Sequence, residues 1–343
     1  MENIIETPKL ALTKQDFESD RMVKWCPGCG DHAILKAVEN VFPELGIPKE
    51  NFVVVSGIGC SSRFPYYMNT YGVHGIHGRA AALATGVKLA NPELSVWMIT
   101  GDGDSMAIGG NHFIHVVRRN PDINILLFNN KIYGLTKGQF SPTSPEGSKT
   151  KTSPQGTYEA PFNPGELVIG AHGKFFARVV DTNIKMMSQV FTEAAKHKGT
   201  SVVEILENCV IFNNQIHALI TSRETKDENQ LFLEAGEPMI FGKERDKGIV
   251  LRGTNLEVVK IGENGITEKD ILVHDPCTED SGIHVMLASM MPPEFPAALG
   301  VIRSVKSHTF EELVWNSVEH EKKTSKLKNV DDLLHTGNTW VKQ

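Results

Sequence analysis

Short apolar runs alternate with amphipathic segments along the first two thirds of the chain. The runs cover residues 52–56 (FVVVS), 95–100 (SVWMIT), 123–128 (INILLF) and 201–206 (SVVEIL). They are nearly unbroken in hydrophobicity, which is typical of strands buried on both faces of a sheet. Helical spacing of apolar residues marks the segments 32–42, 78–90, 105–119 and 184–197. This alternation predicts an α/β fold with a mostly parallel sheet flanked by helices.

The remaining segments divide the chain into parts. Residues 1–20 form a polar lead-in, and residues 21–225 carry the alternating core. Within that core, residues 141–165 are rich in Pro, Ser, Thr and Gly, so we expect a long loop that is either a functional lid or disordered. Residues 226–343 are more charged and less periodic, and we interpret them as a C-terminal extension that ends in a charged helical tail at 311–328.

Composition narrows the class of protein. The 343 residues include 35 Lys and Arg against 41 Asp and Glu, and no basic stripe points to nucleic acid. No apolar segment is long enough for a membrane helix, and the N-terminus has no signal-peptide pattern, so we expect a cytoplasmic protein without membrane contacts. Five Cys in a cytosolic chain favour thiols or metal ligands over disulfides.

A Gly-Asp-Gly sequence at 101–103 and an Asn pair at 129–130 both follow apolar runs, so we place them at the carboxyl ends of neighbouring strands. The Asp102 carboxylate, the Asn130 amide and the Ile132 carbonyl are oxygen ligands suited to Mg²⁺, while the Gly103 and Asp104 amides can receive phosphate. Alone, Gly-Asp-Gly can be an ordinary turn. Together with the Asn pair, it resembles the binding motif for thiamine diphosphate with Mg²⁺.

Four cysteines lie in three segments of the predicted core. Cys26 and Cys29 bracket a turn before the helix at 32–42, Cys60 lies in the Gly-rich segment 57–62, and Cys209 follows the run 201–206. Four thiolates hold either Zn²⁺ or a [4Fe–4S] cluster, and their spacing does not decide between these. Alternatively, Cys60 and Cys209 are small core side chains. Cys277 stands apart in the sequence and is interpreted as a bystander.

The order of motifs indicates a family. WCPGCG, GIGCSSR, HGR, GDGD, NNKIYGLTKGQ and a late Cys follow one another over about residues 20–225. This order resembles the β subunit of the 2-oxoacid:ferredoxin oxidoreductases. The resemblance implies a thiamine diphosphate-binding fold and a CoA-dependent oxidative decarboxylation of a 2-oxoacid to acyl-CoA and CO₂. Electrons would pass through a [4Fe–4S] cluster to ferredoxin.

The resemblance also implies roles for individual residues. The cluster ligands are Cys26, Cys29, Cys60 and Cys209, and the Mg²⁺ ligands are Asp102, Asn130 and Ile132. Contacts to thiamine diphosphate are expected from Ile58, Gly59, Cys60, Ser61, His77, Gly103, Asp104, Gly134 and Leu135. Substrate recognition is expected from Arg63 and Leu135, because an Arg guanidinium matches a carboxylate bidentately. Alternatively, Arg63 is a solvated turn residue and His77 caps the following helix.

The same resemblance implies partners. No Glu of this chain matches the carboxylate that protonates the cofactor's aminopyrimidine, which in the family comes from the α subunit, so we expect a heterodimer or heterotetramer with the extension contacting that subunit. We prefer 2-oxoglutarate over pyruvate or a broad range of 2-oxoacids, with Lys149, Lys151 or the α subunit holding its second carboxylate. The competing hypotheses are a decarboxylase or transketolase relative without a cluster, and a zinc-binding or electron-carrier module.

Overall fold

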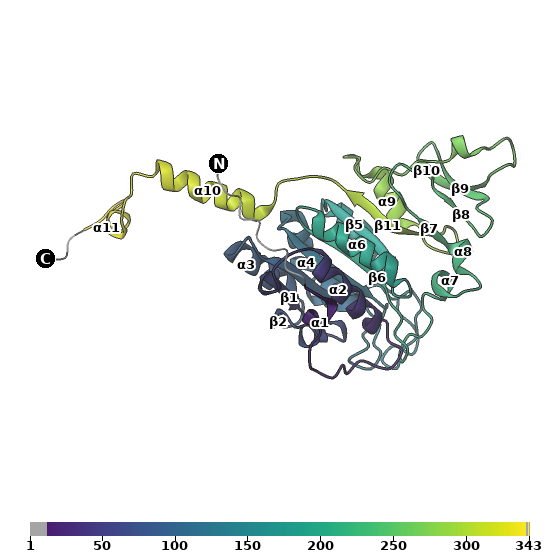
Figure 1. The fold of residues 1–343 in the computed structure, drawn as a ribbon, viewed down its shortest axis with the longest axis horizontal. Coiled ribbons are helices and arrows are strands. Elements are labelled where there is room, and N and C mark those ends of the chain that lie inside the picture. The colour runs from purple at the N-terminus through teal and green to yellow at the C-terminus, as the bar shows by residue number, and fades with distance from the viewer. Residues whose placement is uncertain (1–11, 341, 343) are drawn as a thin grey trace.

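The computed structural model describes residues 12–340 and 342, and within these residues eight strands form one twisted sheet (Figure 1). In sheet order they are β2 (Tyr71–His74), β1 (Phe52–Ser56), β3 (Ser95–Gly101), β4 (Ile123–Asn129), β6 (Ser201–Leu206), β5 (Phe175–Val180), β11 (Ala297–Ser304) and β7 (Gln230–Phe232). The first six run parallel, and β11 is antiparallel to β5. The predicted mostly parallel sheet is therefore confirmed.

Helices cover both faces of this sheet, because strand residues alternate between two apolar cores. Phe52 and Val54 of β1 face the core beneath α2 and α6, whereas Val53 and Val55 face the core beneath α3, α4, α5 and α9. The helices of the two layers and of the N-terminal turn are α1 (Lys14–Phe17), α2 (Asp31–Glu44), α3 (Ala80–Ala90), α4 (Gly110–Arg119), α5 (Pro164–Gly170), α6 (Ile184–Lys196) and α9 (Gly282–Ser289). Among the described residues, no helix is both long and apolar enough to cross a membrane.

The chain after residue 225 takes part in the main sheet as well as extending from it. Two short helices, α7 (Ala218–Thr221) and α8 (Lys226–Asn229), lie on either side of residue 225. The chain then adds β7 at the sheet edge and a small antiparallel sheet. That sheet consists of β8 (Ile240–Phe241), β9 (Lys247–Arg252) and β10 (Asn255–Lys260). Strand β11 then returns between β5 and β7. The sequence pattern did not reveal these strands, so its boundary at residue 225 does not follow an edge of the sheet.

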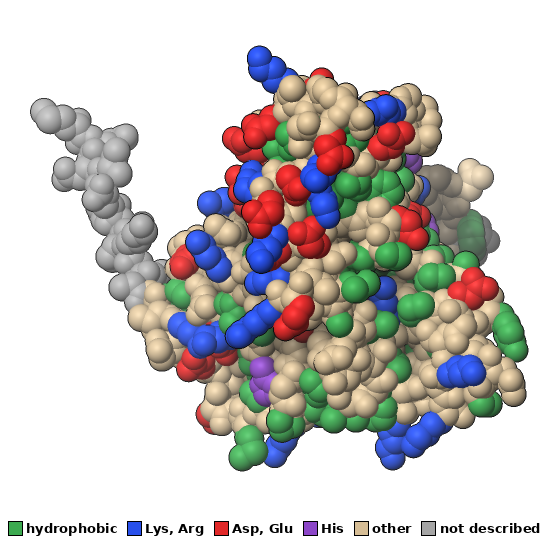
Figure 2. Space-filling model, turned by 90° about the vertical axis from the view of Figure 1, so that its right-hand side faces the viewer, with side chains coloured by type: hydrophobic (Ala, Val, Ile, Leu, Met, Phe, Trp, Pro, Cys, Tyr) green, Lys and Arg blue, Asp and Glu red, His purple; other side chains and the backbone are tan. Residues whose placement is uncertain are grey.

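The face of the molecule at the right of Figure 1, which carries β8, β9 and β10, is drawn in Figure 2. Basic and acidic side chains are interspersed over it, and hydrophobic side chains are scattered among them. This view offers no field of one sign to a polyanion.

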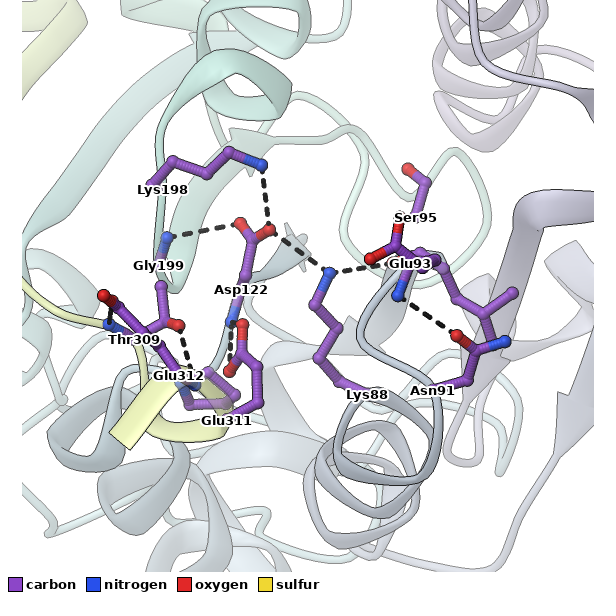
Figure 3. Close-up of polar contacts among 12 residues, drawn as sticks. Lys88, Asn91, Glu93, Ser95, Asp122, Lys198, Gly199, Thr309, Glu311 and Glu312 are labelled. Carbon is purple, nitrogen blue, oxygen red and sulfur yellow. Dashed lines mark hydrogen bonds and ion pairs between the residues drawn. The ribbon is translucent and has the colours of Figure 1, made fainter. Parts of the chain in front are cut away.

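The C-terminal helices α10 (Phe310–Thr324) and α11 (Val330–Leu334) project away from the body as an arm (Figure 1). The base of α10 is fixed by a polar network around Asp122 (Figure 3). The Asp122 carboxylate accepts from Lys88 Nζ at 3.2 Å and from Lys198 Nζ at 3.3 Å. The Asp122 backbone N–H donates to the Glu311 carboxylate, and Trp315 Nε1 donates to the Leu89 carbonyl. The arm is therefore anchored at its root and exposed beyond it.

Candidate functional site

The carboxyl ends of β1, β3 and β4 surround a cavity of about 500 Å³. Parallel strands bring these ends to one edge of the sheet, where the segment 57–61, the Gly-Asp-Gly turn and the Asn pair meet. Every residue that the sequence assigned to the cofactor or to Mg²⁺ lines this cavity: Ile58, Gly59, Cys60, Ser61, His77, Asp102, Gly103, Asp104, Asn130, Ile132, Gly134 and Leu135. The structure therefore brings the predicted binding residues together.

Asp102 is buried at the end of β3, with 3% of its surface exposed. The hydroxyls of Ser141 and Thr143 donate to its Oδ2 atom, and burial raises the pKa of the carboxyl despite these hydrogen bonds. Thr143 also donates to Asn129 Oδ1 at 2.9 Å. The start of the loop 141–165 is thus fastened over the predicted metal ligand. The sequence analysis did not single out Ser141 or Thr143 as part of the site. Their position at the start of an unusually polar loop was the available indication.

The two Asn residues have different surroundings. Asn129 is buried, and its Nδ2 donates to Oε1 of Glu204 in the neighbouring strand β6 at 2.7 Å. Asn130 lines the cavity, and its Oδ1 accepts from the Ile132 N–H at 3.2 Å. Lys131 between them adopts a left-handed φ of 57°, which turns the chain into the cavity. Of the pair, Asn130 lines the cavity, whereas Asn129 fixes the strand end through its bond to Glu204.

Asp104 fastens two loops around the cavity through its carboxylate. Oδ1 accepts from the Gly78 N–H at 2.7 Å, and Oδ2 accepts from Thr100 Oγ1 at 3.2 Å. A Cβ on Gly57 would lie 1.8 Å from Asp104 Oδ2, so only glycine fits there. A π-helical turn, Asp104–Ile108, begins at this residue. The carboxylate is structural, which leaves the backbone amides of this turn as the groups suited to phosphate.

The four predicted thiols share a second cavity of about 240 Å³, adjacent to the first. Cys26 and Cys29 enter it from a turn in which the Cys29 N–H donates to the Cys26 carbonyl at 3.1 Å. The sulfurs of Cys60 and Cys209 converge near Gly134, where an added Cβ would lie 3.6 and 3.5 Å from them. Cys277 is exposed and does not line this cavity. The four cysteines that the resemblance assigned to a cluster therefore line one cavity, and their role as ligands stays a prediction.

Buried acids adjoin these thiols. Cys29 Sγ lies 3.3 Å from both Asp31 Oδ2 and Glu207 Oε1. Burial and the neighbouring carboxylates raise the pKa of Cys29, and burial is the main reason that the pKa of Cys60 rises to about 12. Burial likewise raises the pKa of Asp31 to about 7. These surroundings keep the thiols protonated in the absence of a cation, and a bound metal ion would supply the positive charge that allows them to ionise.

Arg63 lines the thiol cavity but not the cofactor cavity. Its Nε donates to the Tyr67 hydroxyl at 2.8 Å, and its guanidinium lies 5.8 Å from the Tyr67 ring centroid. Leu135 lines both cavities and is about half exposed. Lys149 and Lys151 are exposed and line neither cavity.

The sheet and the first cavity define a thiamine diphosphate-binding domain, and residues 57–205 match the family model "Thiamine pyrophosphate enzyme, C-terminal TPP binding domain". A relative from Mycobacterium tuberculosis, "2-oxoglutarate oxidoreductase subunit KorB", is 44% identical over 330 residues, 95% of this chain and 88% of the relative. The chain belongs to the β subunits of the 2-oxoacid:ferredoxin oxidoreductases. The family predicted from the motifs is therefore confirmed.

Two further comparisons agree with this assignment. A "2-oxoacid:ferredoxin oxidoreductase 1, subunit beta" from Aeropyrum pernix is 47% identical over 190 residues, which are 55% of this chain and 60% of that protein. A solved structure superposes with a TM-score of 0.77 at 28% identity, over 96% of this chain and 98% of the other. Its title is "2-oxoglutarate:ferredoxin oxidoreductase from Magnetococcus marinus with 2-oxoglutarate, coenzyme A and succinyl-CoA bound".

Proposed function

We propose that this β subunit binds thiamine diphosphate with Mg²⁺ in the first cavity and a [4Fe–4S] cluster in the second. With an α subunit in the cytoplasm, as a heterodimer or heterotetramer, it oxidatively decarboxylates 2-oxoglutarate with CoA and passes electrons to ferredoxin. The observation that carries the proposal is the meeting of the two cavities, since Cys60, Gly134 and Leu135 line both. Such a wall suits a donor and an acceptor of electrons that must lie close together.

The first cavity fits Mg²⁺ and a diphosphate by its donors and its shape. Asp102 offers a buried carboxylate, and the Asn130 side chain and the Ile132 backbone lie at the same cavity wall. A Cβ on Gly103 would fall 2.2 Å from the Tyr133 ring, so residue 103 has no room for a side chain and contributes only its backbone to the cavity wall. Tyr133 in turn donates its hydroxyl to the Gly103 carbonyl at 3.0 Å, which holds the turn in place.

The second cavity fits a cluster because four thiols from three segments converge there. Cys29 is the residue two positions before the N-terminus of α2, a helix of 14 residues, so the helix dipole favours an anionic cluster at this place. Bound thiamine diphosphate supplies the carbanion chemistry that decarboxylates a 2-oxoacid, and a cluster accepts electrons singly. The protein's own part is to position both and to exclude water between them.

Substrate preference is proposed from the relatives and from Arg63. The M. tuberculosis relative is named for 2-oxoglutarate, and the M. marinus structure was solved with it. Leu135 lines both cavities and Arg63 lines the second one, and we assign Arg63 to the 2-oxoacid carboxylate and Leu135 to the carbon chain. Because Lys149 and Lys151 lie outside both cavities, the cation for the second carboxylate is assigned to the α subunit.

The α subunit is also assigned the carboxylate that acts on the aminopyrimidine. The carboxyl groups that line the first cavity belong to Asp102, Asp104 and Glu207. All three already accept hydrogen bonds within the chain. Asp102 accepts from Ser141 and Thr143. Asp104 accepts from Gly78 and Thr100, and Glu207 accepts from Cys29 and Asn130. Among the described residues that line this cavity, no carboxyl group is therefore free for that role, and we expect the chain alone to be inactive.

The test is an anaerobic assay of the chain co-expressed with its α subunit. We expect CoA-dependent ferredoxin reduction with a higher kcat/KM for 2-oxoglutarate than for pyruvate or 2-oxobutyrate, and a cluster signal that dithionite reduces. The chain purified alone should give no turnover. A higher kcat/KM for pyruvate would overturn the substrate assignment, and turnover by the single chain would overturn the role given to the α subunit.

A further inference from the structure

Glu207 stands in the wall between the two cavities and lines both of them. It follows β6 directly, its backbone N–H donates to the Asn129 carbonyl at 3.1 Å, and only 1% of its surface is exposed. Among the described residues that line both cavities, it contributes the only carboxyl group. A carboxyl group buried at this place needs a hydrogen-bond partner at each oxygen, because leaving a buried carboxyl group unpaired costs folding free energy.

Each oxygen of the Glu207 carboxyl contacts a different site. Oε1 lies 3.3 Å from Cys29 Sγ, a proposed cluster ligand. Oε2 accepts from Asn130 Nδ2 at 3.3 Å, and Asn130 is a proposed Mg²⁺ ligand. The two proposed ligands come from distant parts of the chain and are joined through one side chain.

Close packing holds Glu207 in this position. A Cβ on Gly30 would lie 2.6 Å from Glu207 Cγ and 2.3 Å from Asp181 Oδ2, so only glycine fits at residue 30. Asp31 offers a useful contrast, because its Oδ2 contacts the same sulfur at 3.3 Å but the residue does not line the cofactor cavity. Asp31 therefore touches one site, whereas Glu207 touches both.

We infer that Glu207 is a positioning residue that couples the proposed Mg²⁺–diphosphate site to the proposed cluster site, an inference that rests on the proposed function. Glu207 Oε2 at Asn130 Nδ2 and the Ile132 N–H at Asn130 Oδ1 together fix the orientation of that amide, and Oδ1 keeps a second lone pair that a metal ion can use. The other oxygen places a carboxyl group beside the sulfur of a proposed cluster ligand, and polar or charged groups next to cluster sulfurs tune the reduction potential. One side chain thus acts on cofactor affinity and on electron acceptance.

The test compares Glu207→Leu with Asp31→Leu in the complex with the α subunit, reconstituted anaerobically. We measure the dissociation constant of thiamine diphosphate at fixed Mg²⁺, the midpoint potential of the cluster, and its EPR signal. Glu207→Leu is expected to raise the dissociation constant at least tenfold and to shift the potential. Asp31→Leu is expected to shift the potential while leaving the dissociation constant within twofold of wild type.

Glu207→Gln provides the rescue, because its amide oxygen can accept from Asn130 and its amide nitrogen can contact the sulfur. We expect it to bind thiamine diphosphate within threefold of wild type. If Glu207→Leu does not fold, Glu207→Asp replaces it, and its side chain, shorter by one methylene, is expected to weaken both contacts and so to raise the dissociation constant and shift the potential.

Wild-type affinity together with wild-type potential in the folded Leu or Asp variant overturns the inference. An altered potential with unchanged affinity in Glu207→Leu also overturns it, because Glu207 would then act as Asp31 does. Absence of thiamine diphosphate binding and of a cluster in the wild-type complex is a distinct result, and it overturns the proposed function itself.

Discussion

At the scale of single residues, a substitution at Asp102 is expected to weaken ligand binding without lowering the stability of the chain. Asp102→Asn keeps the side-chain shape between Ser141 and Thr143 but removes the charge that Mg²⁺ needs. We expect thiamine diphosphate affinity, measured by calorimetry with Mg²⁺, to fall at least a hundredfold. The melting temperature of the cofactor-free chain should stay level or rise, because burial already disfavours the charged carboxylate. Retained affinity would contradict the assignment of Asp102.

His197 gives a residue-scale prediction about pH. Burial against Phe175 lowers the pKa of His197 to about 4 from an ordinary 6.5, and its Nε2 has no partner among the described residues. Between these values the unfolded chain binds a proton that the folded chain does not, so stability falls as pH drops from 6.5 to 4. In His197→Phe, the slope of unfolding free energy against pH should be smaller by close to one proton across this window.

The check is urea unfolding of both chains at several pH values between 4 and 7. Comparing the two slopes cancels the opposite contribution of buried acids such as Asp104, whose raised pKa works in the other direction. Parallel curves for the two chains would show that His197 does not titrate as its burial implies.

The sequence predicted which residues gather at the two cavities, because these residues stand in local motifs. That Asp102, Asn130 and the four cavity cysteines are metal and cluster ligands stays a prediction, which for the cysteines rests on the family resemblance. Ser141, Thr143 and Glu207 could not be predicted, since their importance arises from contacts that only the folded chain creates. Arg63 was placed by resemblance, and its stacking on Tyr67 was invisible in the sequence.

At the scale of elements, the Asp122 carboxylate joins α3 to the turn after α6, while its backbone N–H holds the root of α10. Lys88, 4% exposed, pairs with this carboxylate, so Asp122→Ala leaves a buried ammonium with only the Leu94 carbonyl as acceptor. We expect a loss of about 2–3 kcal/mol in the free energy of unfolding. The control is Lys198→Ala, which removes a 77% exposed partner of the same carboxylate and should cost less than about 0.5 kcal/mol. Equal losses in chemical denaturation would refute this ranking.

Hydrophobic pattern identified four strands that are buried on both faces, but it missed β5, which is buried as completely, as well as β2, β7 and β11. Strands β1, β3, β4 and β6 lie in the middle of the parallel sheet and read as continuous apolar runs. Strand β2 is an exposed edge of four residues and has no such run. Strand β11 carries Arg303 and a Gly, because it borders polar interactions at the antiparallel side of the sheet. Local pattern cannot assign pairing between residues 175–180 and 297–304.

At the scale of the whole molecule, the position of β11 decides what the C-terminal third contributes. Leu299 and Ile302 are fully buried between the layers, and β11 joins β5 to β7. Beyond Ser325 the described side chains are exposed and make few contacts with the body. Removing residues 326–343 should therefore leave the melting temperature within about 2 °C of wild type. Removing residues 296–343 should give an unfolded or aggregated chain, since losing an internal strand and its buried side chains exceeds a typical net stability of about 5–15 kcal/mol. Calorimetry and circular dichroism of the two truncated chains make the comparison, and a cooperatively folded 1–295 chain would show that the core ends before β11.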